Sequence, residues 1–82
     1  MILVDIYVPS VDKVYDFQLN EHTPISAVIE ELSEMIGQKE RSPLYGNASE
    51  LMLCDKSSGR IMHKSDTLSS AGITTGRTLI LV

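Results

Sequence analysis

The side chains that could carry covalent or metal chemistry are few, and they lie far apart along the chain. There is one cysteine, Cys54, and there are two histidines, His22 and His63. Zinc sites need closely spaced ligand pairs, and an iron–sulfur cluster on a small domain would need four cysteines. Reactive cysteines lie beside cations, whereas the residue after Cys54 is the anion Asp55. The sequence therefore predicts no metal site and no activated thiol.

Catalytic and cofactor-binding motifs are also missing from the sequence. No serine lies in a G-x-S-x-G turn, and neither G-x-x-x-x-G-K-[ST] nor G-x-G-x-x-G occurs. Isolated histidines and cysteines are more often structural or solvated than catalytic. We therefore expect a protein that is not an enzyme, with no catalytic residues and no cofactor.

Length and charge narrow the classes of ligand. The chain has 82 residues, of which 43% are hydrophobic and 22% are charged, which predicts one small globular domain over residues 1–82. Seven lysines and arginines stand against eleven aspartates and glutamates, for a net charge of −4. Nucleic acids and anionic membranes need a basic face. A protein is the partner class that this composition favours.

Targeting features point to the cytoplasm. One cysteine cannot form an internal disulfide, although small secreted domains usually contain several. The N-terminus has no basic region before its apolar residues and meets a carboxylate at Asp5. No apolar run approaches the roughly 20 residues that a membrane span needs. We expect a cytoplasmic protein that does not insert into the membrane.

The first half of the chain predicts a hairpin followed by a helix. Alternating apolar residues predict strands over 2–8 and 14–19. The apolar period then changes to that of a helix over 24–36. Thr23 is the expected N-cap, Pro24 the first helical residue, and Gly37 the C-terminal cap.

The second half predicts three short strands. The polar stretch 38–49 is the expected long loop, with Leu44 and Tyr45 holding it to the core. The remaining expected elements are a strand over 50–54, a turn over 55–59, a short strand over 60–62, a 3₁₀ turn over 67–73 anchored by Leu68 and Ile73, and a last strand over 78–82.

The order β-β-α-β-β-β indicates an α+β fold with a mixed sheet. One helix cannot cover both faces of a sheet, so we expect it to lie across one face and leave the other open. The last strand, Thr78-Leu79-Ile80-Leu81-Val82, is the most apolar, which favours a central position.

With this order, the chain resembles ubiquitin and its β-grasp fold over nearly its whole length. The residues that carry the likeness are Thr67-Leu68-Ser69, Ile73, Thr78-Leu79, Leu81 and Val82, together with the helical stripe of Ile25, Val28 and Leu32. Lengths differ from ubiquitin at the loop 38–49 and the turn 55–59.

Within that superfamily, the sequence is similar to the YukD/EsaB family of small bacterial ubiquitin-like proteins. The similar stretches are Tyr15-Asp16-Phe17-Gln18-Leu19, Pro24-Ile25, Val28-Ile29, Gly72-Ile73-Thr74 and Gly76. The resemblance implies a cytosolic accessory or regulatory protein of the type VII (WXG100-type) secretion machinery of Gram-positive bacteria. It also implies a protein partner in that machinery, such as its membrane ATPase.

Two other functions remain open at this point. A ubiquitin-like modifier or sulfur carrier is disfavoured, because ubiquitin continues to a Gly-Gly tail where this chain ends at Val82. A generic ubiquitin-like adaptor unrelated to secretion is the second alternative. We expect a monomer, since charges in the second strand and the shortness of the fourth discourage edge pairing.

The open face of the sheet is the predicted partner-binding surface. Strand parity turns Met52, Ile80 and Val82 away from the helix, and Leu3 and Tyr7 are candidates to join them. The outer face of the helix, with Glu30 and Glu34, is a second candidate, an acidic surface for a basic partner. Each candidate has a competing interpretation. The apolar residues of the sheet face could be scattered surface residues without a function, and the acidic helix face could simply be solvated.

Overall fold

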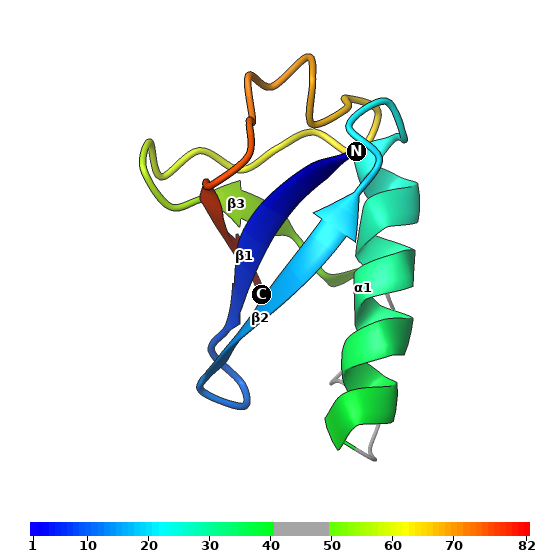
Figure 1. Cartoon of the computed structure of the whole chain (residues 1–82), viewed down its shortest axis with the longest axis vertical. Helices are drawn as coiled ribbons and strands as arrows, with labels where there is room; N and C mark the ends of the chain where they lie inside the picture. Colours follow the sequence, from blue (N-terminus) through cyan, green and yellow to red (C-terminus); the bar gives the residue numbers. More distant parts are fainter. Residues whose placement is uncertain (41–49) are drawn as a thin grey trace.

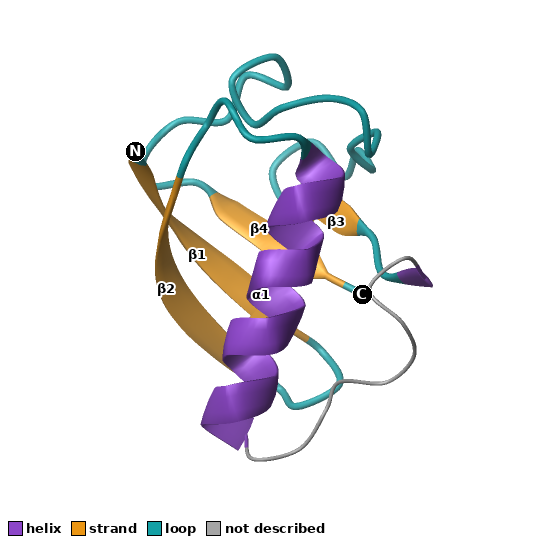
Figure 2. Cartoon of the chain, turned by 90° about the vertical axis from the view of Figure 1, so that its right-hand side faces the viewer, coloured by secondary structure: helices purple, strands orange, loops and turns teal. Residues whose placement is uncertain are grey.

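The computed structural model describes residues 1–40 and 50–82, and in this part of the chain one helix lies across one face of a four-stranded sheet (Figures 1 and 2). The elements are β1 (Ile2–Val8), β2 (Lys13–Leu19), α1 (Ile25–Glu40), β3 (Leu53–Asp55) and β4 (Thr78–Leu81). The sheet order is β2-β1-β4-β3. Strand β4 runs parallel to β1 and antiparallel to β3. The predicted mixed sheet and the central place of the last strand are confirmed.

The hairpin of β1 and β2 has a continuous antiparallel register, from Ile2 opposite Leu19 to Val8 opposite Lys13. Its connection turns at Asp12, which takes a left-handed φ of 51°. Alternation within β1 buries Val4, Ile6 and Val8 and leaves the residues between them on the other face. The hairpin thus supplies half of the sheet and one wall of the core.

Helix α1 begins one residue later than predicted and is not capped by Thr23. The Pro24 carbonyl accepts the first helical hydrogen bond, from Val28 N–H at 3.1 Å. The N–H groups of Ile25 and Ser26 donate to the carbonyls of Asp66 (2.7 Å) and Lys64 (3.0 Å). A distant loop therefore satisfies the donors at the helix start, which local sequence cannot reveal.

The predicted helix end at residue 36 is wrong as well. Gly37 lies inside α1, which continues to Glu40. Lys13 on β2 pairs with Glu40 at 3.0 Å, and the Lys39 ammonium lies 5.9 Å from the centre of the Tyr15 ring. These contacts hold the last turn against the hairpin and offset the roughly 1 kcal/mol that a glycine costs a helix.

The predicted strand 60–62 is reduced to a single bridge between Cys54 and Ile61. Asp55 N–H donates to the Arg60 carbonyl and Met62 N–H to the Leu53 carbonyl, at 2.9 Å each, and there the pairing ends. The expected strand 50–54 is also displaced, since β3 covers Leu53–Asp55. Among the described residues, the sheet therefore has four strands instead of five.

Residues 67–73 form hydrogen-bonded turns instead of the predicted 3₁₀ turn. The two predicted anchors are confirmed, since Leu68 and Ile73 are both buried. The expected loop 38–49 begins only after Glu40, and the predicted anchoring roles of Leu44 and Tyr45 lie outside the described residues.

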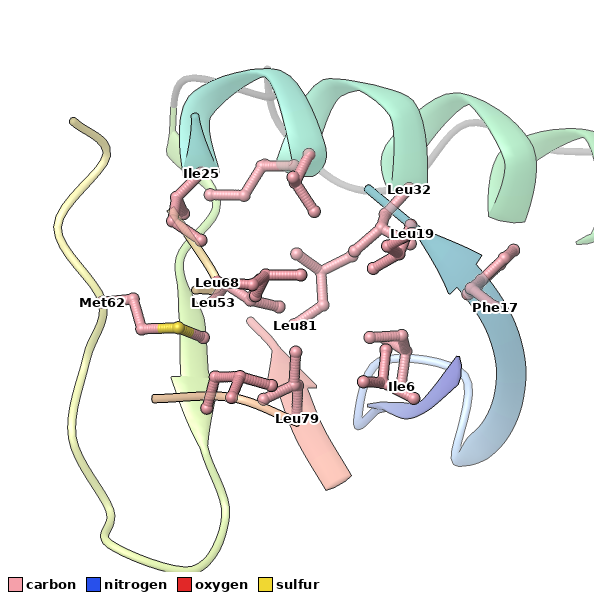
Figure 3. Packing of buried hydrophobic residues seen from close by; sticks show 14 of the residues in the cluster. Ile6, Phe17, Leu19, Ile25, Leu32, Leu53, Met62, Leu68, Leu79 and Leu81 are labelled. Carbon is pink, nitrogen blue, oxygen red and sulfur yellow. The ribbon is translucent and has the colours of Figure 1, made fainter. Parts of the chain in front are cut away.

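The core fills the space between α1 and the inner face of the sheet (Figure 3). Five helical positions, spaced as on one face of a helix, are buried: Ile25, Val28, Ile29, Leu32 and Ile36. They pack against Ile6 on β1 and Leu79 on β4, while Met62 and Leu68 come from the loops. The inner face of the sheet is thus used for folding, and the outer face stays open to contacts with other molecules.

Candidate protein-interaction surface

The outer face of the sheet carries a row of side chains that crosses all four strands. Strand pairing places Tyr7 opposite both Val14 and Ile80, and Ile80 opposite Cys54. The bridge from Cys54 extends the row to Ile61. Partners on adjacent strands point to the same side of a sheet, so these five side chains lie next to one another.

A further apolar pair lies beside this row. Met52 N–H donates to the Val82 carbonyl at 2.6 Å, and Val82 N–H donates to the Met52 carbonyl at 3.0 Å. This pair of hydrogen bonds places the two residues opposite each other, Met52 directly before β3 and Val82 directly after β4. Both side chains lie on the same side of the sheet as those of Cys54 and Ile80. We call the set the outer apolar surface: Tyr7, Val14, Met52, Cys54, Ile61, Ile80 and Val82.

The rim of the outer apolar surface is exposed and its centre is half-buried. Val14 is 58% exposed, Ile61 57%, Val82 43% and Met52 41%. Tyr7, Cys54 and Ile80 are intermediate, because each has a neighbour on both sides. Exposed apolar side chains that form one contiguous patch are typical of interaction sites, and single scattered ones are not.

The structure brings four of the five predicted residues together and separates the fifth. Met52, Ile80, Val82 and Tyr7 share the surface, whereas Leu3 is separated from Tyr7 by Asp5 on the same strand. Leu3 is 51% exposed, and its N–H group faces the Thr75 hydroxyl at 3.3 Å.

Sequence reasoning missed Val14, Cys54 and Ile61. Parity along β2 and β3 could have found the first two, because Val14 is two residues from Asp16 and Cys54 two from Met52. Ile61 enters only through its bridge to Cys54, which no local pattern indicates.

Carboxylates surround the hairpin end of this surface. The Tyr7 hydroxyl donates to Asp12 Oδ1 at 3.0 Å, and this bond with the nearby negative charge raises the pKa of Tyr7. One row away from Tyr7 and Val14, Asp5 lies directly opposite Asp16 on the outer face. A hydrogen bond between the two carboxyl groups, followed by their repulsion, raises the pKa of Asp5.

An ion pair between Arg77 and the buried Asp55 carboxylate holds the neighbouring end of β3 in place. Asp55 is only 6% exposed, and it accepts bonds from Arg77 Nη2 (2.7 Å), Ser58 Oγ (3.0 Å) and Ser57 N–H (3.2 Å). Asp55 was predicted to start a turn, whereas it is the last residue of β3. Its contacts instead fix the turn after β3 to the start of β4, which gives it a structural role beside the outer apolar surface.

A polar hollow of about 320 Å³ lies next to this ion pair. Its lining mixes charges of both signs, with Arg60, His63, Asp66 and Arg77 among its residues. Residues 1–40 and 50–82 contain no cluster of three or more side chains able to hold a metal ion. The mixed charge selects no particular ligand.

The outer face of α1 is exposed at Glu30 and Glu34, where the acidic surface was predicted. No large apolar side chain of comparable exposure lies among the described residues of α1. This face therefore stays a secondary prediction.

Comparison with known proteins places the fold. The ubiquitin-like domain of EccD5 from Mycobacterium xenopi has a TM-score of 0.81 and 25% identity, with 99% of this chain and 91% of that one covered. The ubiquitin-like domain of Dsk2 from Plasmodium falciparum has a TM-score of 0.76 and 17% identity, over 99% of this chain and 95% of that one. A de novo protein designed on ubiquitin matches at a TM-score of 0.68 and 21% identity, over 99% and 85%. The fold is that of ubiquitin.

The family follows from the sequence profile. None of the curated proteins matches the chain significantly. No helix in the described part of the chain is long and apolar enough to cross a membrane. The profile of the family described as "WXG100 protein secretion system (Wss), protein YukD" matches residues 2–81. The chain therefore belongs to the YukD family of ubiquitin-like proteins linked to WXG100 secretion.

Proposed function

We propose that this protein is a non-enzymatic, non-conjugated interaction module, a cytoplasmic accessory or regulatory component of a WXG100 secretion system. It binds another protein of that machinery, such as its membrane ATPase, through the outer apolar surface. The observation that carries the proposal is the contiguity of that surface, in which four side chains between 41% and 58% exposed surround a half-buried centre. The helix covers the opposite face, so folding alone does not need this one to be apolar.

The non-enzymatic part of the proposal is supported by the surroundings of Cys54. This thiol is half-buried, and its cross-strand neighbours are Ile80 and Ile61. Neither isoleucine can act as the cation or general base that helps to form the thiolate, the nucleophilic form of a cysteine. In this position the cysteine serves as a small apolar contact residue.

Direct binding measurements with purified components of the secretion machinery test the proposal. The informative variant is the double substitution Met52→Asp/Val82→Asp, which places charge at two exposed positions without touching the core. Leu3→Asp is the matched control, because Leu3 is an equally exposed apolar residue on the same face but outside the surface.

We expect wild type and the control to bind a machinery component with the same affinity, and the double variant to bind at least about tenfold more weakly. Equal binding by all three proteins would contradict a role for the outer apolar surface. Failure of every machinery component to bind wild type would contradict the secretion role.

A further inference from the structure

Two carboxylates lie beside the outer apolar surface and face each other across β1 and β2. Asp5 on β1 is directly opposite Asp16 on β2. Asp5 N–H donates to the Arg77 carbonyl at 3.1 Å, on the side away from β2. The two residues therefore form a non-hydrogen-bonded pair, the arrangement that brings cross-strand side chains closest together.

Three positive groups of the described residues are paired with other carboxylates. The ion pairs recorded among the described residues join the N-terminus to Glu21, Lys13 to Glu40 and Arg77 to Asp55. Lys13, on the same strand as Asp16, faces the helix side of the sheet. Lys56 lies in the same row as Asp5, but Thr78 on β4 stands between them.

Like charges directly opposite each other destabilise a sheet, so folding gains nothing from this pair when both carboxylates are ionised. Asp5 and Asp16 are two residues from Tyr7 and Val14 along their strands, a spacing of about 7 Å. A partner seated on the outer apolar surface thus reaches the carboxylates with its next side chain. No cluster of three potential metal ligands exists among the described residues, so a partner side chain is the better source of positive charge.

We propose that the outer apolar surface and the pair Asp5–Asp16 form one composite docking face, whose occupant is a protein segment with apolar side chains next to an arginine or lysine. The apolar side chains lie on the row through Tyr7 and Ile80, and the cation lies between the two carboxylates. Arginine fits best, because its planar guanidinium can bond both carboxylates at once. This inference rests on the proposed docking role of the outer apolar surface and adds the chemistry of the partner.

A random peptide display library is the probe, because it presents every combination of apolar and charged residues without prior choice of a partner. Peptides selected on wild-type protein are sequenced and their affinities measured at low and high salt. The same peptides are then tested on Asp5→Asn/Asp16→Asn. Glu30→Gln/Glu34→Gln is the matched control, since it removes the same charge from the outer face of α1.

We expect the selected peptides to be enriched in arginine or lysine next to apolar residues, relative to the starting library, and to bind more weakly at high salt. Binding should fall at least about tenfold in Asp5→Asn/Asp16→Asn and stay unchanged in the control. Met52→Asp/Val82→Asp should also abolish binding of the selected peptides.

Two different failures are distinguishable. If peptides need Met52 and Val82 but show no basic enrichment, or bind Asp5→Asn/Asp16→Asn as well as wild type, the composite face is overturned and the docking surface stands. If no selected peptide depends on Met52 and Val82, the docking role fails, and the composite face fails with it.

Discussion

At the scale of single residues, the most constrained polar group is the Asp55 carboxylate. It is buried and receives its strongest bond from Arg77, whose side chain is one-third exposed. Among the residues that the structure describes, removing the arginine leaves a buried anion with the Ser57 N–H and the Ser58 hydroxyl as its hydrogen-bond donors. A buried charge that loses its partner is more costly than the net value of the pair.

We therefore expect Arg77→Ala to lower the free energy of unfolding by about 1–3 kcal/mol, the usual cost of a buried group that loses its bond. Arg77→Lys should recover part of this loss. Urea denaturation followed by circular dichroism measures both. Wild-type stability in Arg77→Ala would show that Asp55 does not depend on the pair.

The carboxylate pair gives a pH-dependent expectation at the same scale. The pKa of Asp5 is raised by its hydrogen bond with Asp16 and by their repulsion. Folding therefore favours protonated Asp5, and this contribution to stability is present below the unfolded pKa and lost as pH rises through the folded pKa. Asp5→Asn should remove this loss of stability at higher pH. The midpoint of urea denaturation should therefore be higher in the variant than in wild type at neutral pH. An unchanged midpoint and pH profile, with Glu34→Gln as control, would contradict the interaction.

At the scale of elements, the last turn of α1 depends on the hairpin. Glu40 lies beside the Tyr15 hydroxyl and bonds to Lys13 at 3.0 Å, and these two contacts, in that order, lower the pKa of Glu40. The Tyr15 oxygen is buried and does not reach good hydrogen-bond geometry, so the Lys13 bond is the firmer contact. The contacts of Glu40 with Lys13 and Tyr15 thus support the continuation of α1 past Gly37.

Glu40→Gln should accordingly weaken the dependence of the free energy of unfolding on pH in the acid range. The lowered pKa means that the stability from ionised Glu40 is present above the unfolded pKa and is lost as pH falls through the folded pKa. Denaturation midpoints measured from neutral to acid pH should fall less in Glu40→Gln than in wild type. Parallel profiles for the two proteins would mean that Glu40 carries no folding-linked charge.

The same elements show where sequence reasoning succeeds. The apolar residues of β4 were sufficient to predict its central position, because burial on the helix side leaves a pattern in the strand itself. The start and end of α1 could not be predicted, since the carbonyls of Lys64 and Asp66 and the side chain of Lys13 come from distant segments. Sequence reasoning did not assign Ile61 to the outer apolar surface for the same reason, because its position there depends on a single β-bridge to Cys54.

At the scale of the whole molecule, the two faces of the sheet differ in role: the inner face forms the core, and the outer face is the proposed binding surface. The inner face contributes Leu79 and Ile6, fully buried, to the core under α1, while the outer face keeps Val82 and Met52 partly exposed. Substitutions on the two faces should therefore separate stability from binding.

Leu79→Ala should lower the free energy of unfolding by about 2–5 kcal/mol, because it opens a cavity in the core. Val82→Ala, three residues away, should change it by no more than about 0.5 kcal/mol, as expected of a surface site. Thermal and urea denaturation compare the two variants. Similar losses in both would show that the outer apolar surface also serves folding.

The most direct test of the central claim is an NMR titration of the isotope-labelled protein with the secretion component that it binds. The account predicts that shift changes and line broadening concentrate at the outer apolar surface, with Ile80 and Cys54 at its centre. Changes confined to the outer face of α1, around Glu30 and Glu34, would contradict it.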